Sequence, residues 1–312
     1  MIGLLACGLA VLPRAGGDGL RHATTRTLGC ALALMTLASF GILLSRTLEL
    51  NGGDWATFFP DMRVALAVTH FGHVWWWRVP ALALAWAAWL WASRHDRRLS
   101  LWVMLPAIAA IALTRSETGH PADHGDFTLA VWIDWLHILA AGVWVGSLFG
   151  MSLVVFPRLL RAGQSALARS AAIFQRLSIL SGVALAVLVA CGIYNAATQL
   201  RGFAGLLTTR YGITLDVKLA IVLAMIAIGA HNRYIKLPRL RTAARGSASG
   251  TPDIIRACAR AVLAESLLGL AVIGATATLI HAMPPADART PHAMAAMATP
   301  VETPIAAAPA PR

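Results

Sequence analysis

Residues 131–156 read VWIDWLHILAAGVWVGSLFGMSLVVF, a run of 26 residues whose only ionisable side chains are Asp134 and His137. A helix needs about 20 apolar residues to cross the roughly 30 Å of hydrocarbon in a membrane, so this run is long enough. Hydrocarbon offers no partner to an open backbone, and a helix satisfies its own hydrogen bonds. The stretch therefore predicts a membrane-spanning helix with an acid and an imidazole inside it.

The composition extends this interpretation to the whole chain. The 312 residues are 58% hydrophobic and 13% charged, with a mean hydropathy of +0.67, whereas soluble domains carry about 25% charged residues. Strand-like alternation is absent. We expect an all-α integral membrane bundle of about eight helices, near residues 1–12, 27–45, 68–92, 100–114, 131–156, 172–196, 213–233 and 260–281.

The two ends of the chain need separate treatment. The first apolar segment, within 1–27, is short and lacks the basic start and cleavage site of a signal peptide. It is either a short helix or a span whose start codon was placed too late, so the count is eight or seven. Residues 28–281 form the predicted transmembrane domain. Residues 282–312 are rich in Ala and Pro, which predicts a disordered tail. Its His292 and nearby Met residues are either incidental or weak copper ligands.

The basic residues predict the orientation. Seventeen of the 26 Lys and Arg residues lie in segments 13–26, 92–99, 157–176 and 233–260, and seven lie in the alternate segments. The positive-inside rule places the richer set in the cytoplasm. Both termini of an eight-helix bundle are then outside, with the C-terminus in the periplasm. The net charge of +12 thus reflects membrane orientation rather than nucleic acid, and the four scattered cysteines predict neither a disulfide framework nor a zinc site.

Most histidines fall on or near the predicted outer face. This set comprises His70, His73, His120, His124, His137, His281 and His292. Five further polar residues lie in the outer halves of their helices, namely Arg78, Asp134, Asn195, Asp216 and Lys218. Ionisable groups inside a membrane are costly and usually face a partner or a wet cavity. We therefore expect these helices to converge on one outward-opening polar chamber.

Candidate metal ligands in this chamber come in pairs. Asp134 and His137 share a helix face. Either the carboxylate orients the imidazole, or both bind one metal, or they make a structural hydrogen bond between helices. His70 and His73 are either ligands or interfacial residues. His120 and His124 bracket a Gly- and Pro-containing turn that is either a metal-binding loop or a solvated turn. His281 completes the candidate metal ligands.

The remaining polar residues are expected to support the chamber. Asp216 and Lys218 point to different sides of their helix, so each needs a partner on another helix. Asp134 with Lys218 and Asp216 with Arg78 are the pairings considered. Near the inner side, Glu265 is expected close to the end of its helix.

Two further patterns have simpler interpretations. Trp75, Trp76 and Trp77, with Trp89 and Trp91, are predicted membrane-interface anchors. The stripe Gly142, Gly146 and Gly150 predicts close packing of helices.

Several motifs, in order, resemble the copper resistance protein D family. They are Thr69-His70-Phe71-Gly72, Gly119-His120, Asp134-Trp135-Leu136-His137 followed by Trp144 and Gly146, Phe174-Gln175-Arg176, Tyr194-Asn195, Tyr211-Gly212, Lys218-Leu219 and His231-Asn232-Arg233. The stretch around Asp134 is the most specific of them, and the resemblance covers roughly residues 28–281.

The resemblance implies a bacterial inner-membrane protein of copper homeostasis, with the copper ion as bound or transported species. It also implies a separate periplasmic CopC-like carrier, because this chain lacks the fused carrier domain of larger relatives. Import and export remain open. The abbreviated first helix is a second departure from the family.

Two alternatives use the same residues differently. A b-type haem electron-transfer protein needs two axial histidines, of which His137 with His73 or His281 are the candidates. A non-transporting assembly or scaffold subunit needs no metal at all. We expect no enzyme, because no HExxH or GxSxG motif is present, and no P-loop is present to bind ATP.

Overall fold

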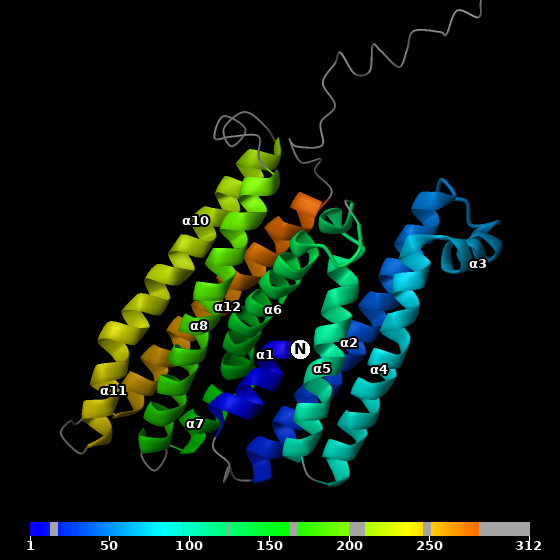
Figure 1. Ribbon diagram of the computed structural model, residues 1–312. Coiled ribbons are helices and arrows are strands. Elements are labelled where there is room, and N and C mark those ends of the chain that lie inside the picture. Colours follow the sequence, from blue (N-terminus) through cyan, green and yellow to red (C-terminus); the bar gives the residue numbers. More distant parts are fainter. Residues whose placement is uncertain are drawn as a thin grey trace, which may run out of the picture.

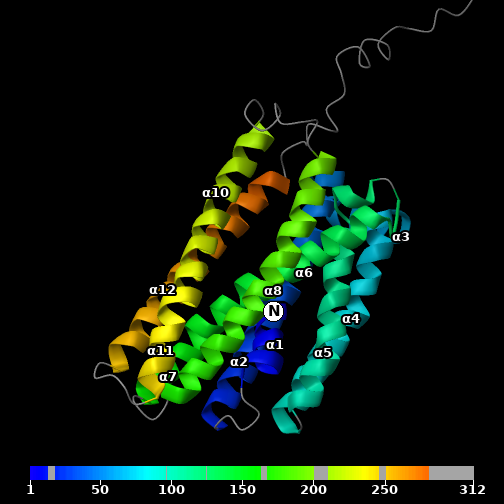
Figure 2. The same ribbon diagram turned by 60° about the vertical axis from the view of Figure 1, so that its left-hand side comes forward.

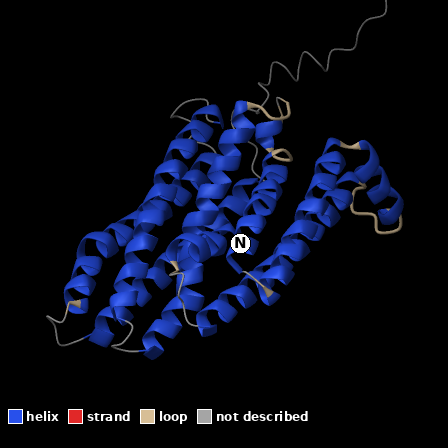
Figure 3. Ribbon diagram, turned by 60° about the horizontal axis from the view of Figure 1, so that its bottom comes forward, coloured by secondary structure: helices blue, strands red, loops and turns tan. Residues whose placement is uncertain are grey.

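The computed structural model describes residues 1–12, 18–95, 97–123, 125–162, 167–199, 210–245 and 251–280, and within these ranges it contains helices and no strands (Figures 1 and 3). Its main helices are α1 (Ile2–Ala6), α2 (Asp18–Leu50), α3 (Phe58–Val68), α4 (His70–Arg94), α5 (Arg97–Ser116), α6 (Leu129–Gly150), α7 (Phe156–Ala162), α8 (Leu167–Gln199), α10 (Arg210–His231), α11 (Leu237–Ala244) and α12 (Thr251–Ile280). Four shorter elements are η1 (Cys7–Val11), η2 (His120–Ala122), η3 (Met151–Val155) and η5 (Asn232–Lys236).

The predicted all-α membrane bundle is confirmed. Six described stretches are long and apolar enough to cross a membrane: α2, α5, α6 continued through η3 and α7, α8, α10 continued through η5 and α11, and α12. Helix α4 has 25 residues and runs alongside α2 and α5 (Figure 1), so its length suits a seventh span. The segment Ile2–Val11 is too short to cross. The described helices therefore fit the seven-span alternative.

The helix boundary that matters most for the chemistry is the start of α12. The sequence indicated a start at residue 260, but α12 begins at Thr251. The expectation that Glu265 lies near the inner end of its helix is therefore wrong. Glu265 is at the midpoint of the candidate span Asp253–Ala277. The charged side chains of the first turns hid this extension, because hydropathy counts them against a span.

The glycine stripe of α6 packs against the N-terminal helix. A Cβ on Gly3 would lie 2.3 Å from the carbonyl carbon of Gly146, and one on Gly142 would lie 2.6 Å from Ile2. The two helices therefore approach backbone to backbone at Gly3 and Gly146, as small-residue stripes allow in membranes. The predicted packing role of the stripe is confirmed, and its partner is α1.

The N-terminal segment also joins two hydrophobic clusters. Leu4 and Leu5 belong to the cluster that α1 forms with α2, α4 and α5. Cys7 and Val11 belong to the cluster formed with α6, α7, α8, α10, α11 and α12. The N-terminus lies about midway along the long helices, between the two groups (Figures 1 and 2).

The interfacial role of the tryptophans holds for only part of the set. Trp76, Trp77 and Trp91 are exposed, which suits interface anchors. Trp75 is buried with its ring 5.9 Å from Phe40. Trp89 donates from Nε1 to the Thr25 carbonyl at 2.8 Å. These two rings pack α4 against α2.

We predict that Gly3→Ala destabilises the protein, because the added methyl group meets the backbone of Gly146. Overpacking of this kind costs about 1–3 kcal/mol. Gly41→Ala is the matched control, since a Cβ there meets no atom within 4 Å. It should be neutral or stabilising, as alanine favours helix over glycine by up to about 1 kcal/mol. Thermal unfolding of both purified variants in detergent measures the difference, and equal melting temperatures would contradict the packing account.

Candidate functional site

A tight corner between α3 and α4 positions His70. Thr69 caps α4, because its hydroxyl accepts from the Gly72 amide at 3.0 Å and donates to the Ala65 carbonyl at 2.5 Å. A Cβ on Gly72 would lie 2.3 Å from that same carbonyl oxygen. Only glycine therefore lets α4 begin directly against α3. His70, as the first residue of α4, then faces the end of α5.

His70 lies beside two carboxylates. Its Nε2 is 3.1 Å from the carbonyl oxygen of Glu117 and 3.6 Å from Oδ1 of Asp126. One ligand atom from each of His70, Glu117 and Asp126 can be chosen so that all three lie within 4.8 Å of one another. We call these three residues the outer cluster. Among the described residues, no other group of three His, Cys, Asp or Glu meets this criterion.

Glu117 is the buried member of the outer cluster. It is 4% exposed, and its Oε2 has no hydrogen-bond partner among the described residues. Its Oε1 accepts from the Phe127 amide at 3.2 Å. Burial raises the pKa of the Glu117 carboxyl above its usual range and Asp126 adds to the rise, while the Phe127 amide and His70 act in the opposite direction. A bound cation would relieve this penalty by supplying positive charge to Oε2.

The hydrogen bond from the Phe127 amide to the Glu117 carboxylate requires an unfavourable backbone conformation at Phe127. Its φ is +55°, the one positive value recorded for a described non-glycine residue. A left-handed conformation costs such a residue roughly 1–2 kcal/mol. Backbone strain of this kind concentrates at functional sites. The loop between α5 and α6 is thus shaped around the Glu117 carboxylate.

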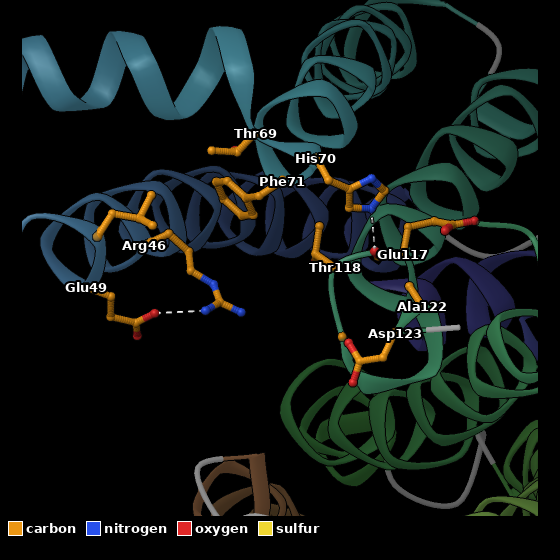
Figure 4. A pocket seen from close by; sticks show the side chains of 11 residues that line it. Arg46, Glu49, Thr69, His70, Phe71, Glu117, Thr118, Ala122 and Asp123 are labelled. Atoms are coloured by element: carbon orange, nitrogen blue, oxygen red, sulfur yellow. Dashed lines mark hydrogen bonds and ion pairs between the residues drawn. The ribbon is translucent and has the colours of Figure 1, made fainter. Parts of the chain in front are cut away.

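A cavity of about 290 Å³ borders the outer cluster at His70 and Glu117. His70, Glu117, Asp123, Arg46 and Glu49 are among its lining residues, and Arg46 pairs with Glu49 at 2.9 Å (Figure 4). The His70 ring and the Asp123 carboxylate extend from α4 and from the α5–α6 loop (Figure 4). The cavity thus reaches two residues of the outer cluster, His70 and Glu117.

A second polar group, here called the membrane cluster, lies deeper and consists of Ser116, Asp134, His137 and Asn195. The hydroxyl of Ser116 lies 2.8 Å from Oδ2 of Asp134 and 2.9 Å from the Val131 carbonyl, the two acceptors of its single proton. Asn195 Nδ2 donates to Oδ1 of Asp134 at 3.5 Å. These bonds join α5, α6 and α8. Asp134 therefore faces the bundle interior, as expected for a membrane carboxylate.

His137 lies one helical turn below Asp134. Its ring faces Gly192 of α8, where an added Cβ would lie 3.4 Å from Cε1. Its Nδ1 is buried and has no hydrogen-bond partner among the described residues. Lys218 and Asp134 act on it electrostatically. An unpartnered ring nitrogen in this position is free to accept a proton or a metal ion.

Several predicted site residues lie outside these clusters. His73 is exposed on α4, and His120 pairs with Asp123 on the surface at 3.3 Å. His124 and His281 fall outside the described residues. Lys218 acts on Asp134 electrostatically, without a direct ion pair in the described part of the chain.

The suggested pairing of Arg78 with Asp216 is wrong. Buried Arg78 instead donates to the Thr114 hydroxyl at 2.8 Å, across the contact between α4 and α5. Asp216 lies on α10, in the other half of the bundle (Figure 1).

The placement of the histidines also bears on haem. His73 is exposed near the start of α4, whereas His137 faces α8. These two side chains do not face one another as axial ligands must. The described residues thus give His137 no axial partner.

Sequence reasoning missed Ser116, Glu117 and Asp126. Histidines and ionisable groups inside apolar runs stand out in the sequence, whereas these three residues flank such a run. Their one signal is the segment Ser116-Glu117-Thr118-Gly119-His120, where polar residues directly follow an apolar helix.

The fold and the site together define a multi-pass helical membrane protein with a cluster of metal-ligand residues at one end of the bundle. Comparison with protein families gives the class. The model described as "Copper resistance protein D" matches residues 171–279, and the model of the copper resistance protein D-like N-terminal domain matches residues 1–128. The chain belongs to the copper resistance protein D family, which confirms the resemblance seen in the sequence.

Individual relatives agree with this assignment. The chain is 27% identical to copper resistance protein D of Pseudomonas syringae pv. tomato, over 80% of this chain and 81% of that one. It is 26% identical to the inner membrane protein YebZ of Escherichia coli, over 67% and 70%. It is also 26% identical to the copper transport protein CutJ of Bacillus subtilis, over 84% of this chain but only 46% of that longer protein. No solved structure gave a significant match.

We predict that Ser116→Ala lowers stability by about 1–3 kcal/mol, because Oδ2 of Asp134 loses its donor inside the bundle. Ser93→Ala is the matched control, since that exposed hydroxyl bonds only to the Leu90 carbonyl of its own helix. Thermal unfolding in detergent compares the two. Similar small losses in both variants would mean that the Ser116–Asp134 bond does not hold α5 to α6.

Proposed function

We propose that this protein moves copper ions across the bacterial inner membrane. In this proposal copper binds at the outer cluster and passes the membrane cluster on its path. Membership of the copper resistance protein D family supports copper as the ion. The name of the relative YebZ supports a location in the inner membrane, and the name of CutJ supports copper transport as the activity. The basic segments are placed in the cytoplasm, which puts the outer cluster and the C-terminus on the periplasmic side.

One observation carries the proposal: consecutive residues of α5 and its following turn belong to the two clusters. The Glu117 carbonyl accepts from His70 Nε2 at 3.1 Å, and the Ser116 hydroxyl donates to Asp134 at 2.8 Å. A cation leaving the Glu117 carboxylate toward the bundle interior would therefore meet Asp134 and then His137. The polar groups form a series from the cavity to the middle of α6.

The donor set favours cupric copper at the outer cluster. One imidazole and two carboxylates are nitrogen and oxygen ligands, whereas cuprous copper prefers thiolate and thioether. Among divalent first-row ions, Cu²⁺ binds such sites most tightly. The Nε2 proton of His70 now points at a carbonyl, so it must move to Nδ1 before Nε2 can bind the ion.

In this proposal copper enters the protein from the periplasmic side, through the cavity beside His70. Asp123 lines the cavity and pairs with His120 at 3.3 Å, so this pair would meet the ion first. A separate periplasmic CopC-like carrier would deliver or accept it there. The sequence has no P-loop, so movement would follow a gradient or a coupled ion. We assign no catalytic reaction to the chain.

We predict that His70→Ala and Glu117→Gln each weaken Cu²⁺ binding about tenfold or more, because each removes one of three ligands; tenfold corresponds to ~1.4 kcal/mol. Titration of the purified protein in detergent, followed by the Cu²⁺ electron paramagnetic resonance signal, measures the change. His73→Ala is the matched control: it lies three residues further along the same helix, exposed and outside the cluster. Equal affinity in all variants would show that copper does not bind at the outer cluster.

We predict that His137→Ala abolishes copper flux while leaving Cu²⁺ binding at the outer cluster intact, because His137 acts on the path and not at entry. Flux is measured in proteoliposomes of known orientation, with Cu²⁺ and with Cu⁺ kept reduced. His95→Ala, an exposed histidine beyond the other end of α4, should transport normally. Normal flux through His137→Ala would overturn the proposed path.

A further inference from the structure

A third polar group lies in the middle of α12, away from the outer cluster and the membrane cluster. Glu265 is 4% exposed and sits at the midpoint of the candidate span of α12. Asn232, also 4% exposed, donates from Nδ2 to Oε1 of Glu265. A carboxyl group at this depth is costly, which makes it a functional candidate.

The hydrogen bonds of this pair are incomplete without one more proton. Oδ1 of Asn232 is buried and has no donor among the described residues. An amide can donate to one oxygen of a carboxylic acid and accept from the other. A proton on Oε2 of Glu265 would supply a donor of the kind that Oδ1 lacks. Gly229 of α10 faces Oε2 without a side chain, so that residue offers it no competing partner.

The surrounding charges leave Glu265 without an ion pair in the described part of the chain. Lys236 of η5 acts on it electrostatically, but its Nζ donates to the Ala257 carbonyl at 3.3 Å. Arg233 of η5 donates to Ser178 of α8, and Arg158 of α7 donates to the Val154 carbonyl of η3. From η3, only the neutral hydroxyl of Ser152 approaches, bonding to Ser266 at 3.0 Å.

The helix that carries Asn232 is locally irregular. Asn232 begins the π-helical segment η5, which interrupts the continuous α10–α11 rod. Such π segments inside α-helices occur frequently at functional sites. Here the irregular turn starts at the residue that binds Glu265.

We propose that Glu265 and Asn232 form a proton-binding site in the middle of the membrane, through which proton transfer accompanies copper movement. Oε2 of Glu265 takes up one proton and becomes neutral, and returns to the carboxylate when that proton leaves toward the opposite side. The coupling to copper rests on the proposed function, whereas proton binding does not.

Infrared difference spectroscopy tests proton binding without copper. A pH step on the purified protein should change the carbonyl band of a protonated carboxylic acid. Glu265→Gln should remove that change, and Asn232→Ala should shift the band because the amide hydrogen bond is lost. The control Asp253→Asn, an exposed acid on the same helix, should keep it. An unchanged band in Glu265→Gln, or no titrating band over the range in which the protein stays folded, would overturn the site.

Transport with a pH-sensitive dye inside proteoliposomes tests the coupling. The wild type should move protons together with copper, and Glu265→Gln should move copper down its gradient with proton movement reduced to background. Proton movement that persists in this variant, or copper flux without protons in the wild type, would refute the coupling. If the wild type moves no copper, the proposed function fails, and the infrared result still decides whether Glu265 binds a proton.

Discussion

The fold follows from the requirement that every backbone N–H and C=O inside hydrocarbon has a partner within the protein. Long helices meet this requirement by themselves, and polar side chains must then find partners between helices. Ser116 with Asp134, Arg78 with Thr114 and Asn232 with Glu265 are three such contacts. Each lies inside the bundle. The need for hydrogen-bond partners inside the membrane therefore explains both the long helices and the positions of the polar side chains between them.

The helices could be predicted because apolar length is a property of local sequence. Their ends could not, since the first turns of α2 and α12 carry charged side chains that leave the hydrocarbon while the helix continues. The earlier start of α12 changes the role inferred for Glu265, because the residue lies at the centre of the span and not near the end of the helix. The helix that packs against the α6 glycine stripe could not be predicted either. A segment of ten mostly apolar residues at the N-terminus is compatible with a membrane span and with a short helix packed inside the bundle.

The candidate site was predictable in part. Asp134 and His137 stand out as ionisable residues in an apolar run, and Asn195 faces Asp134 in the structure. The outer cluster depends on the path of a loop: directly after Asp126, the left-handed Phe127 donates its amide to the Glu117 carboxylate. Spacing alone does not reveal such a turn. Helical spacing also grouped residues that the structure separates: His70 and His73 lie on the same helix, but only His70 belongs to the outer cluster.

The position of α1 constrains how the bundle can move. Its contact with α6 is main chain against main chain at Gly3 and Gly146, with the Leu4 side chain against Gly150, while Leu5 belongs to the aliphatic cluster of α2, α4 and α5. Aliphatic surfaces slide and repack more readily than two backbones held in contact. If the halves rock against each other, as repeats of many transporters do, α1 should travel with α6 as one body. The surface that slides then lies on the side of α1 that carries Leu5.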